Sequence, residues 1–233
     1  MIKYIGNDRY KVIEKIGNGI MTEVFLCRVF GEDYDEAAIK VYIKKDKDEL
    51  SEHFFERECE VLGMLRHENI VRLLDKGYDQ EIGAYYIALE YVDGKTLGQI
   101  IKHKKVSLDY AENVISQIFN ALEYSHNNGI LHRDIKPSNI MIDRSGNVKV
   151  IDFGISKIIE SLSQDYTVVH AMTPKYASPE QRLGKTLNYS SDIYSLGLLI
   201  YEVLSGKEYN TEDNIEELIK NNHSISEDKK LIL

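Results

Sequence analysis

The stretch that decides the fold of this chain is His132-Arg133-Asp134-Ile135-Lys136-Pro137-Ser138-Asn139. It comes shortly after a helical pattern over 108–127, which closes at Asn128-Gly129, a pair typical of a helix end. The stretch is therefore a loop that follows a helix. It places a carboxylate, a lysine and an amide close together in the sequence.

A second carboxylate, Asp152, follows a short strand thirteen residues after Asn139. Between them lies Ser145-Gly146-Asn147, which predicts a hairpin turn that would fold Asp152 back beside Asn139. One charged and one neutral oxygen ligand suit Mg²⁺, and Asp134 is then left to orient a substrate hydroxyl and accept its proton. The alternative is that these residues only cap turns, which explains any one of them but not the ordered set.

The first part of the chain has the alternation of a β-sheet with one helix. Strands are predicted at 10–16, 23–30, 36–42, 70–74 and 85–91, and a helix at 47–65. This pattern predicts an antiparallel sheet with one packed helix.

Two features of that sheet could bind phosphate. The turn at Gly17-Asn18-Gly19 lies between two strands, where a glycine-rich backbone can approach phosphate groups closely. Because no helix follows, a dinucleotide-binding unit is the poorer interpretation, and the motif alone is better explained as an ordinary hairpin. Lys40 ends an apolar strand and has Glu58 as a candidate partner, although in isolation they would be a snorkelling lysine and a solvated glutamate.

After Asp93-Gly94 the pattern becomes mainly helical. Helices are predicted at 97–104, 108–127 and 193–204, and a long polar loop at 156–175, a length that is usually functional. The predicted fold class is therefore α+β, with a small β-rich lobe over 1–89, a hinge over 90–94 and a mainly helical lobe over 95–233. Ligands tend to bind between two such units.

Composition excludes several classes of protein. The formal net charge of −9 provides no basic surface for nucleic acid. Cys27 and Cys59 lack the spacing of metal ligands, so we expect no disulfide and a reducing, cytoplasmic compartment. No apolar stretch reaches the roughly 20 residues that a membrane span needs, and the start does not look like a signal peptide. The oligomeric state stays open.

Together these segments resemble the protein-kinase superfamily, above all the eukaryotic-like (Hanks-type) serine/threonine kinases of bacteria. The motifs that carry the resemblance are the stretch 132–139, Asp152-Phe153-Gly154 and Thr173-Pro174-Lys175-Tyr176-Ala177-Ser178-Pro179-Glu180. The match covers the chain from Tyr10 to Leu204 in the expected order. It implies a bilobal protein-kinase fold and ATP-dependent transfer of phosphate to protein hydroxyls, with Mg²⁺ as cofactor and Mn²⁺ as an alternative metal.

The resemblance implies a role for each residue of the catalytic motifs. Asp134 would be the catalytic base, and Lys136 would steady the γ-phosphate. Asn139 and Asp152 would hold Mg²⁺.

The same resemblance implies a nucleotide site. Lys40 would contact the α- and β-phosphates and pair with Glu58, and the backbone of 90–92 would hydrogen-bond adenine beside the gatekeeper Leu89. The other implied ATP-binding residues are Ile16, Gly17, Gly19, Val24, Ala38, Glu90, Val92 and Met141.

Acceptor specificity also follows from the resemblance. Lys136 lies two residues after Asp134, as in serine/threonine kinases, and Thr173 matches the threonine that faces the acceptor hydroxyl in that group. We therefore expect protein serine and threonine as acceptors, and dual specificity stays open.

Regulation is implied by Arg133, which in this family pairs with a phosphorylated activation loop and orders it. Thr167 is the favoured phosphorylation site and Ser163 a further candidate, although both could be ordinary polar loop residues. The resemblance gives Phe153 a regulatory role as well.

Three departures from the family pattern stand out. Thr22 replaces the third glycine of the glycine-rich loop, and Met172 stands where glycine commonly precedes the threonine. After Gly206 only 211–221 looks helical, so we expect an abbreviated C-terminal lobe. Glu180 would then lack the arginine that its family equivalent pairs with, find a partner locally, or be stabilised by another chain.

Two other functions remain open from the sequence. One is a nucleotide-binding pseudokinase that acts as a scaffold, and the other is a kinase-like phosphotransferase for small molecules. The presence of Lys40, Glu58, Asp134 and Asp152 argues against the first, and Lys136 argues against the second.

Overall fold

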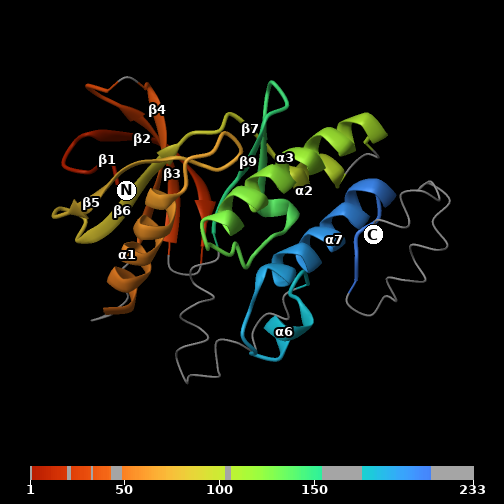
Figure 1. Ribbon diagram of the computed structural model, residues 1–233. Helices are drawn as coiled ribbons and strands as arrows, with labels where there is room; N and C mark the ends of the chain where they lie inside the picture. Colours follow the sequence, from red (N-terminus) through yellow and green to blue (C-terminus); the bar gives the residue numbers. More distant parts are fainter. Residues whose placement is uncertain are drawn as a thin grey trace. The chain divides into compact units, whose positions relative to one another are not determined.

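The computed structural model describes residues 2–19, 22–32, 34–42, 49–102, 106–153 and 175–210 (Figure 1). The chain divides into two compact units, Met1–Asp93 and Gly94–Leu233. The loop residues Ser163, Thr167, Met172 and Thr173, and the tail over 211–233, lie outside the described residues.

The first unit is a six-stranded antiparallel sheet in the order β1-β2-β3-β4-β6-β5. Helix α1 (Glu49–Met64) packs against β4, β5 and β6. The strands are β1 (Tyr4–Ile5), β2 (Tyr10–Asn18), β3 (Thr22–Val29), β4 (Glu36–Tyr42), β5 (Leu73–Asp79) and β6 (Ala84–Glu90).

The alternation of strand β4 sorts its side chains onto the two faces of this sheet. Ala37, Ile39 and Val41 are buried in a core that also holds residues of β1, β2, β3 and β6. Lys40 and Tyr42 point to the opposite face, where both contact α1. The period of two along β4 therefore separates the apolar core from a polar pair.

Strand β5 differs from its predicted position at 70–74, since it begins at Leu73 and continues to Asp79. It is the last strand in the sheet order, and its second half is the polar run Lys76-Gly77-Tyr78-Asp79. An edge strand does not need a continuous apolar pattern, so hydrophobicity alone did not reveal it.

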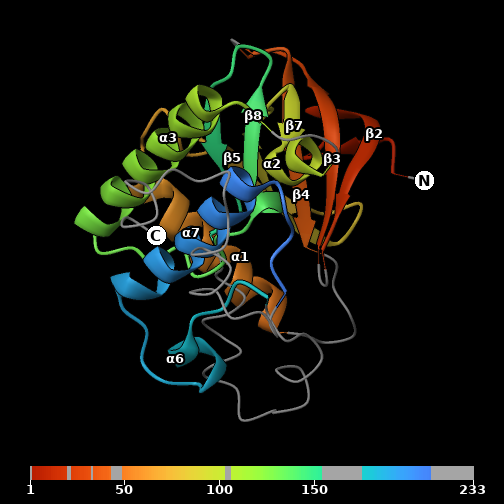
Figure 2. The ribbon, with the colours of Figure 1, turned by 90° about the vertical axis from the view of Figure 1, so that its right-hand side faces the viewer.

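The second unit contains a small antiparallel sheet in the order β7-β8-β9, two of whose strands are labelled in Figure 2. Helices α3 and α7 lie side by side. The elements are β7 (Gly94–Thr96), α2 (Leu97–Ile101), α3 (Leu108–Asn127), the 3₁₀ turn η1 (Pro137–Asn139), β8 (Ile140–Asp143), β9 (Val148–Val150), α6 (Pro179–Arg182) and α7 (Tyr189–Ser205).

Helix α7 begins at Tyr189, earlier than the predicted start at 193. Asn188 caps it, because its side chain accepts the backbone N–H of Ser190 at 2.8 Å. The side chain of Ser191 completes the capping box. The first turn is polar, so an apolar period did not mark it, although it carries the buried Asp192.

In the part of the chain that the structure describes, no helix has the length and apolar character needed to cross a membrane.

Gly94 offers a test of how β7 joins its sheet. A Cβ at this position would lie 2.0 Å from the carbonyl oxygen of Ile142, a distance that no real Cβ contact allows. We expect Gly94→Ala to destabilise the protein by about 1–3 kcal/mol, because β7 must move away from β8. Thermal unfolding followed by circular dichroism would measure this change.

Gly63→Ala is the matched control. Gly63 lies on the exposed side of α1 with open space around its Cβ position, so alanine should stabilise the helix by about 0.5–1 kcal/mol. Equal effects of the two substitutions would contradict the close approach at Gly94.

Candidate active site

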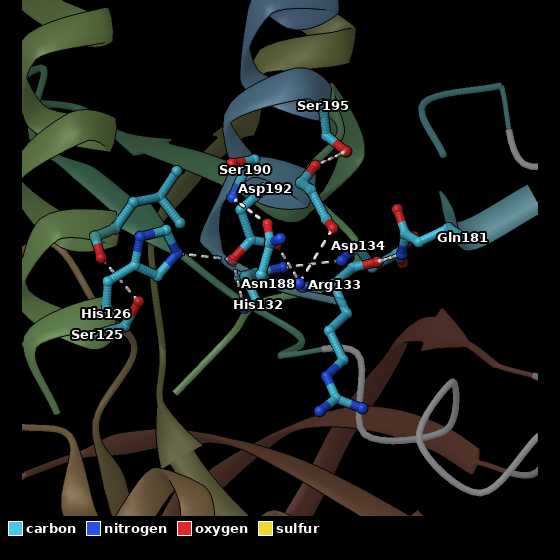
Figure 3. A network of polar contacts seen from close by, with 12 residues as sticks. Ser125, His126, His132, Arg133, Asp134, Gln181, Asn188, Ser190, Asp192 and Ser195 are labelled. Carbon is cyan, nitrogen blue, oxygen red and sulfur yellow. Dashed lines mark hydrogen bonds and ion pairs between the residues drawn. The ribbon is translucent and has the colours of Figure 1, made fainter. Parts of the chain in front are cut away.

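One buried carboxylate, Asp192, holds the start of the loop 132–139. Asp192 lies in the first turn of α7 and is 1% exposed. Its Oδ2 accepts the backbone N–H of His132 at 2.8 Å, and its Oδ1 accepts the N–H of Arg133 at 2.7 Å. The ring Nε2 of His126, from the end of α3, lies 2.8 Å from Oδ2 (Figure 3). The loop is thus tied to two helices through one side chain.

These bonds stabilise an uncommon backbone conformation at Arg133. Its φ is +68°, in the left-handed region that costs energy for a residue with a Cβ. Its N–H is held by Asp192, and its carbonyl accepts the side-chain amide of Gln181 at 2.8 Å. Bonds on both sides of the residue therefore keep it in place.

The environment of Asp192 favours its ionised form. Burial alone would raise the pKa of this carboxyl, but the hydrogen bond from His126 and the backbone N–H groups of Arg133 and His132 outweigh it. The pKa of Asp192 consequently lies below its ordinary value. At neutral pH, Asp192 is therefore a charged acceptor for the backbone N–H groups of the loop.

His132 is completely buried and links two parts of the site. Its Nδ1 accepts the backbone N–H of Asp134 at 3.2 Å, so its Nε2 carries the proton and donates to the carbonyl of Ile151 at 3.1 Å. Burial lowers the pKa of His132, which fits this neutral tautomer. Its ring also packs on Phe153, with centroids 4.6 Å apart.

Asp134, Lys136 and Asn139 come together as the sequence predicts. Lys136 Nζ lies 2.7 Å from Asp134 Oδ2. The side-chain amide of Asn139 donates to the backbone carbonyl of Asp134 at 2.9 Å and to its Oδ2 at 3.0 Å. A carbonyl can only accept, so the nitrogen of Asn139 must face Asp134, and these two bonds do not use its Oδ1.

The hairpin between Asn139 and Asp152 folds the chain back as predicted. Strands β8 and β9 pair with Ile140 opposite Val150, and the N–H of Ile151 donates to the carbonyl of Asn139 at 2.9 Å. Asp152 is the next residue, with an exposed side chain and a φ of +54°. A second left-handed residue thus lies at the end of the hairpin.

Lys40 and Glu58 form an ion pair in the first unit. Lys40 Nζ lies 2.8 Å from Oε1 and 3.1 Å from Oε2 of Glu58, and both side chains are largely buried. The hydroxyl of Tyr42 donates to Glu58 Oε2 as well. Neither a snorkelling lysine nor a solvated glutamate describes these side chains.

Strand register pairs some of the other predicted ATP-binding residues of the first unit. Val24 is opposite both Gly17 and Lys40, and Ala38 is opposite Leu89. Ile16 lies on β2, Glu90 is the last residue of β6, and Val92 comes two residues later. Met141 belongs to the second unit and lies on β8, opposite Thr96.

The turn after Gly17 closes at Gly19, whose N–H donates to the carbonyl of Thr22 at 2.7 Å. A Cβ on Gly19 would lie 2.5 Å from the hydroxyl oxygen of Thr22. A Cβ here would require the Thr22 hydroxyl to turn away, whereas the Thr22 carbonyl oxygen, at 3.6 Å, would be in ordinary contact.

Glu180 has a local partner among the described residues, one of the three outcomes that the sequence leaves open. The hydroxyl of Ser191 donates to its Oε1. This hydrogen bond is the main reason that the pKa of Glu180 lies below its ordinary value. The contact ties α6 to the first turn of α7, beside Asp192.

The sequence pattern alone did not reveal Asp192, His126, Gln181 or Tyr42. The one local signal for Asp192 is a carboxylate in the first turn of an otherwise apolar helix. The polar partners of His126 and Gln181 lie 66 and 48 residues away, so nothing nearby in the sequence marks them.

A family model described as the protein kinase domain matches residues 10–231. The chain belongs to this family. The kinase domain is 39% identical over 206 residues to the serine/threonine-protein kinase PrkC of Bacillus subtilis, covering 85% of this chain and 31% of PrkC. It is 38% identical over 213 residues to the serine/threonine-protein kinase PknB of Mycobacterium tuberculosis, covering 89% and 34% of the two chains. The kinase domain thus spans about a third of the length of these relatives.

Solved structures agree on the fold. The PknI kinase domain of Mycobacterium tuberculosis matches with a TM-score of 0.70 and 26% identity, over 92% of this chain and 81% of that one. The predicted α+β kinase fold and the resemblance to bacterial serine/threonine kinases are therefore confirmed.

The role of Asp192 can be tested through the pH dependence of stability. In Asp192→Asn an amide NH₂ would face one of the N–H donors, so we expect a loss of about 2–4 kcal/mol at neutral pH. Since the folded pKa is depressed, this stabilisation is present above the unfolded pKa of about 3.9 and is lost as pH falls through the folded pKa. The difference in melting temperature between wild type and variant should therefore shrink below about pH 4.

Asp109→Asn is the control for this experiment. Asp109 also lies in the first turn of a helix, α3, but is exposed, and its loss should cost about 0.3–1 kcal/mol. A difference for Asp192→Asn that stays constant between pH 7 and pH 3 would contradict the proposed charge of Asp192.

Proposed function

We propose that this kinase domain is a serine/threonine protein kinase that transfers the γ-phosphate of ATP to protein hydroxyls. The observation that carries the proposal is the arrangement at Asp134. Its Oδ2 lies 2.7 Å from Lys136 Nζ and 3.0 Å from the amide nitrogen of Asn139. Asp192 holds the start of this loop by accepting two of its backbone N–H groups. The names and identities of the bacterial relatives support the same activity.

Asp134 acts as the catalytic base in this proposal. Lys136 and Asn139 both contact its Oδ2, and a carboxylate held in this way can orient an acceptor hydroxyl and take up its proton as the oxygen attacks phosphorus. Lys136 would neutralise charge on the transferred phosphoryl group. Because both side chains are positioned before substrate binds, little reorganisation is needed during the reaction.

The donor set at Asn139 and Asp152 fits Mg²⁺ in its chemistry. Among the described residues, no group of three or more His, Cys, Asp or Glu side chains could hold a metal ion. A cation there would depend on one amide oxygen and one carboxylate together with water and phosphate oxygens, a set that Mg²⁺ prefers. Mg²⁺, or Mn²⁺ in its place, would supply charge neutralisation on the phosphates.

The nucleotide would be bound by the residues that the kinase resemblance implies. Lys40, held by Glu58, would contact the α- and β-phosphates, and Gly17 and Gly19 would cover them. We propose a hinge over 90–94, between lobes at 1–89 and 95–233, with the backbone near Glu90 and Val92 holding adenine. The remaining contacts would come from Ile16, Val24, Ala38, Leu89 and Met141.

Lys136 and Thr173 support serine and threonine as acceptors. Protein substrates and a cytoplasmic location belong to the same proposal and stay predictions from the sequence.

The proposal is tested by transfer of label from radiolabelled ATP with Mg²⁺ to a basic protein. Wild type should transfer phosphate, and Asp134→Asn should lower kcat at least about 100-fold, because the base is lost. Lys40→Met should lower it strongly as well. Asp109→Asn, which changes an exposed aspartate of α3, should leave the rate unchanged.

Two outcomes would contradict the proposal. Nucleotide binding without transfer to any acceptor would indicate a pseudokinase scaffold. Transfer to aminoglycosides or choline but not to protein would indicate a small-molecule phosphotransferase.

We further propose that autophosphorylation of Thr167, or of Ser163, regulates the enzyme through Arg133 and Phe153. The backbone of Arg133 is fixed on both sides, and its guanidinium points away from Asp192 (Figure 3). After incubation with Mg-ATP, mass spectrometry should find phosphate in the segment 156–176 of wild type and none in Asp134→Asn. An active enzyme with this segment unmodified would contradict the idea.

A further inference from the structure

The Lys40–Glu58 pair has a third member, Tyr42. The Tyr42 hydroxyl donates to Glu58 Oε2, while Lys40 Nζ lies 2.8 Å from Oε1 and 3.1 Å from Oε2. Tyr42 is 2% exposed and Glu58 is 6% exposed, so this contact is shielded from water. The carboxylate is consequently held by two donors from one strand.

The position of Tyr42 follows from the geometry of β4. Residues two apart on a strand point to the same face, so Lys40 and Tyr42 both point toward α1. On α1, Phe55 and Glu58 are three residues apart and share one face of the helix. The ring of Phe55 meets the ring of Tyr42 edge-on, with centroids 5.8 Å apart. This packing limits the directions that the Tyr42 hydroxyl can take.

A second tyrosine makes a similar contact with the same helix at an exposed site. The Tyr85 hydroxyl donates to Glu52, and its ring stacks on that of Phe55 with centroids 4.7 Å apart. This hydrogen bond raises the pKa of Tyr85 to about 12, so the phenol stays a donor. The contact of Tyr85 is with Glu52, whereas the ion pair of Lys40 described above is with Glu58. Removing the Tyr85 hydroxyl therefore tests the anchoring of α1 separately from the Lys40–Glu58 pair.

We propose that Tyr42 is a positioning residue for the reaction, which acts by holding Glu58 in the orientation that Lys40 needs. The inference rests on the proposed kinase function, in which Lys40 contacts the ATP phosphates. A glutamate has several rotatable bonds, and one ion pair alone orients it weakly. A buried hydroxyl that donates to a charged carboxylate adds a strong, directional contact. A small displacement of a phosphate-binding lysine is costly for rate.

The competing interpretation is structural. A buried tyrosine hydroxyl usually needs a hydrogen-bond partner, and Glu58 could serve only as that partner. The two interpretations differ in whether the effect of losing the hydroxyl passes through Lys40.

The first experiment compares Tyr42→Phe with Tyr85→Phe, which remove one hydroxyl each and keep both rings. We expect Tyr42→Phe to lower kcat/KM for ATP about tenfold, the equivalent of one lost hydrogen bond to a charged group. Tyr85→Phe should change it less than about twofold, because an exposed contact contributes little. Equal losses in the two variants would indicate mere anchoring of α1 and overturn the proposal.

A double-mutant cycle separates positioning from stability. In the Lys40→Met background, Tyr42→Phe should not lower the residual rate further, because the group that Glu58 positions is gone. Any loss of melting temperature would persist in that background. A tenfold effect that remains without Lys40 would show that Tyr42 does not act through the pair.

The labelling rate of Lys40 by an amine-acylating reagent measures the pair without requiring catalysis. Peptide mass spectrometry should find faster labelling of Lys40 in Tyr42→Phe than in wild type or Tyr85→Phe. Unchanged labelling would overturn the role of Tyr42 even in an active enzyme. A wild type that transfers no phosphate would overturn the proposed function instead, and the labelling result would still decide the role of Tyr42.

Discussion

The loop over 132–139 depends on the buried carboxylate of Asp192. Removing a charge from water is costly unless the charge is paired and hydrogen-bonded, and here the donors are the loop itself and a histidine of α3. The loop therefore stabilises the charge, and the charge shapes the loop. Because α7 carries the aspartate and α3 carries the histidine, the packing of the two helices and the geometry of the loop are formed together.

Two residues have left-handed backbone conformations: Arg133, near the start of the loop over 132–139, and Asp152, after strand β9. Such conformations persist only where the surroundings over-determine them. Asp192 and Gln181 hold Arg133, and neutral His132 spans from the backbone of Asp134 to the carbonyl that precedes Asp152. A protonated His132 could not accept the N–H of Asp134. Burial of the ring keeps it neutral, and the neutral ring can bond both to the backbone of Asp134 and to the carbonyl before Asp152.

The first unit also contains a largely buried charged pair, which is stabilised by other residues. Its apolar core occupies one face of β4, and the opposite face brings Lys40 and Tyr42 to one glutamate of α1. A lysine beside an apolar core is stable here because its charge is paired within the same unit. The ring of Phe55, on α1, contacts the rings of both Tyr42 and Tyr85.

The sequence by itself determined the family, the strand alternation of the first unit, the hairpin between Asn139 and Asp152 and the pairing candidate for Lys40. Each of these depends on local period, a turn signal or motifs in a set order, which are readable along the chain. It did not reveal the polar edge strand β5 or the capped start of α7, because neither has an apolar period. Only the tertiary structure decided that Asp192 holds the loop, that His132 is a neutral donor at Nε2 and that Tyr42 contacts Glu58. These contacts join side chains by packing across helices and strands, and a local pattern carries no information about which distant polar group will satisfy a buried one.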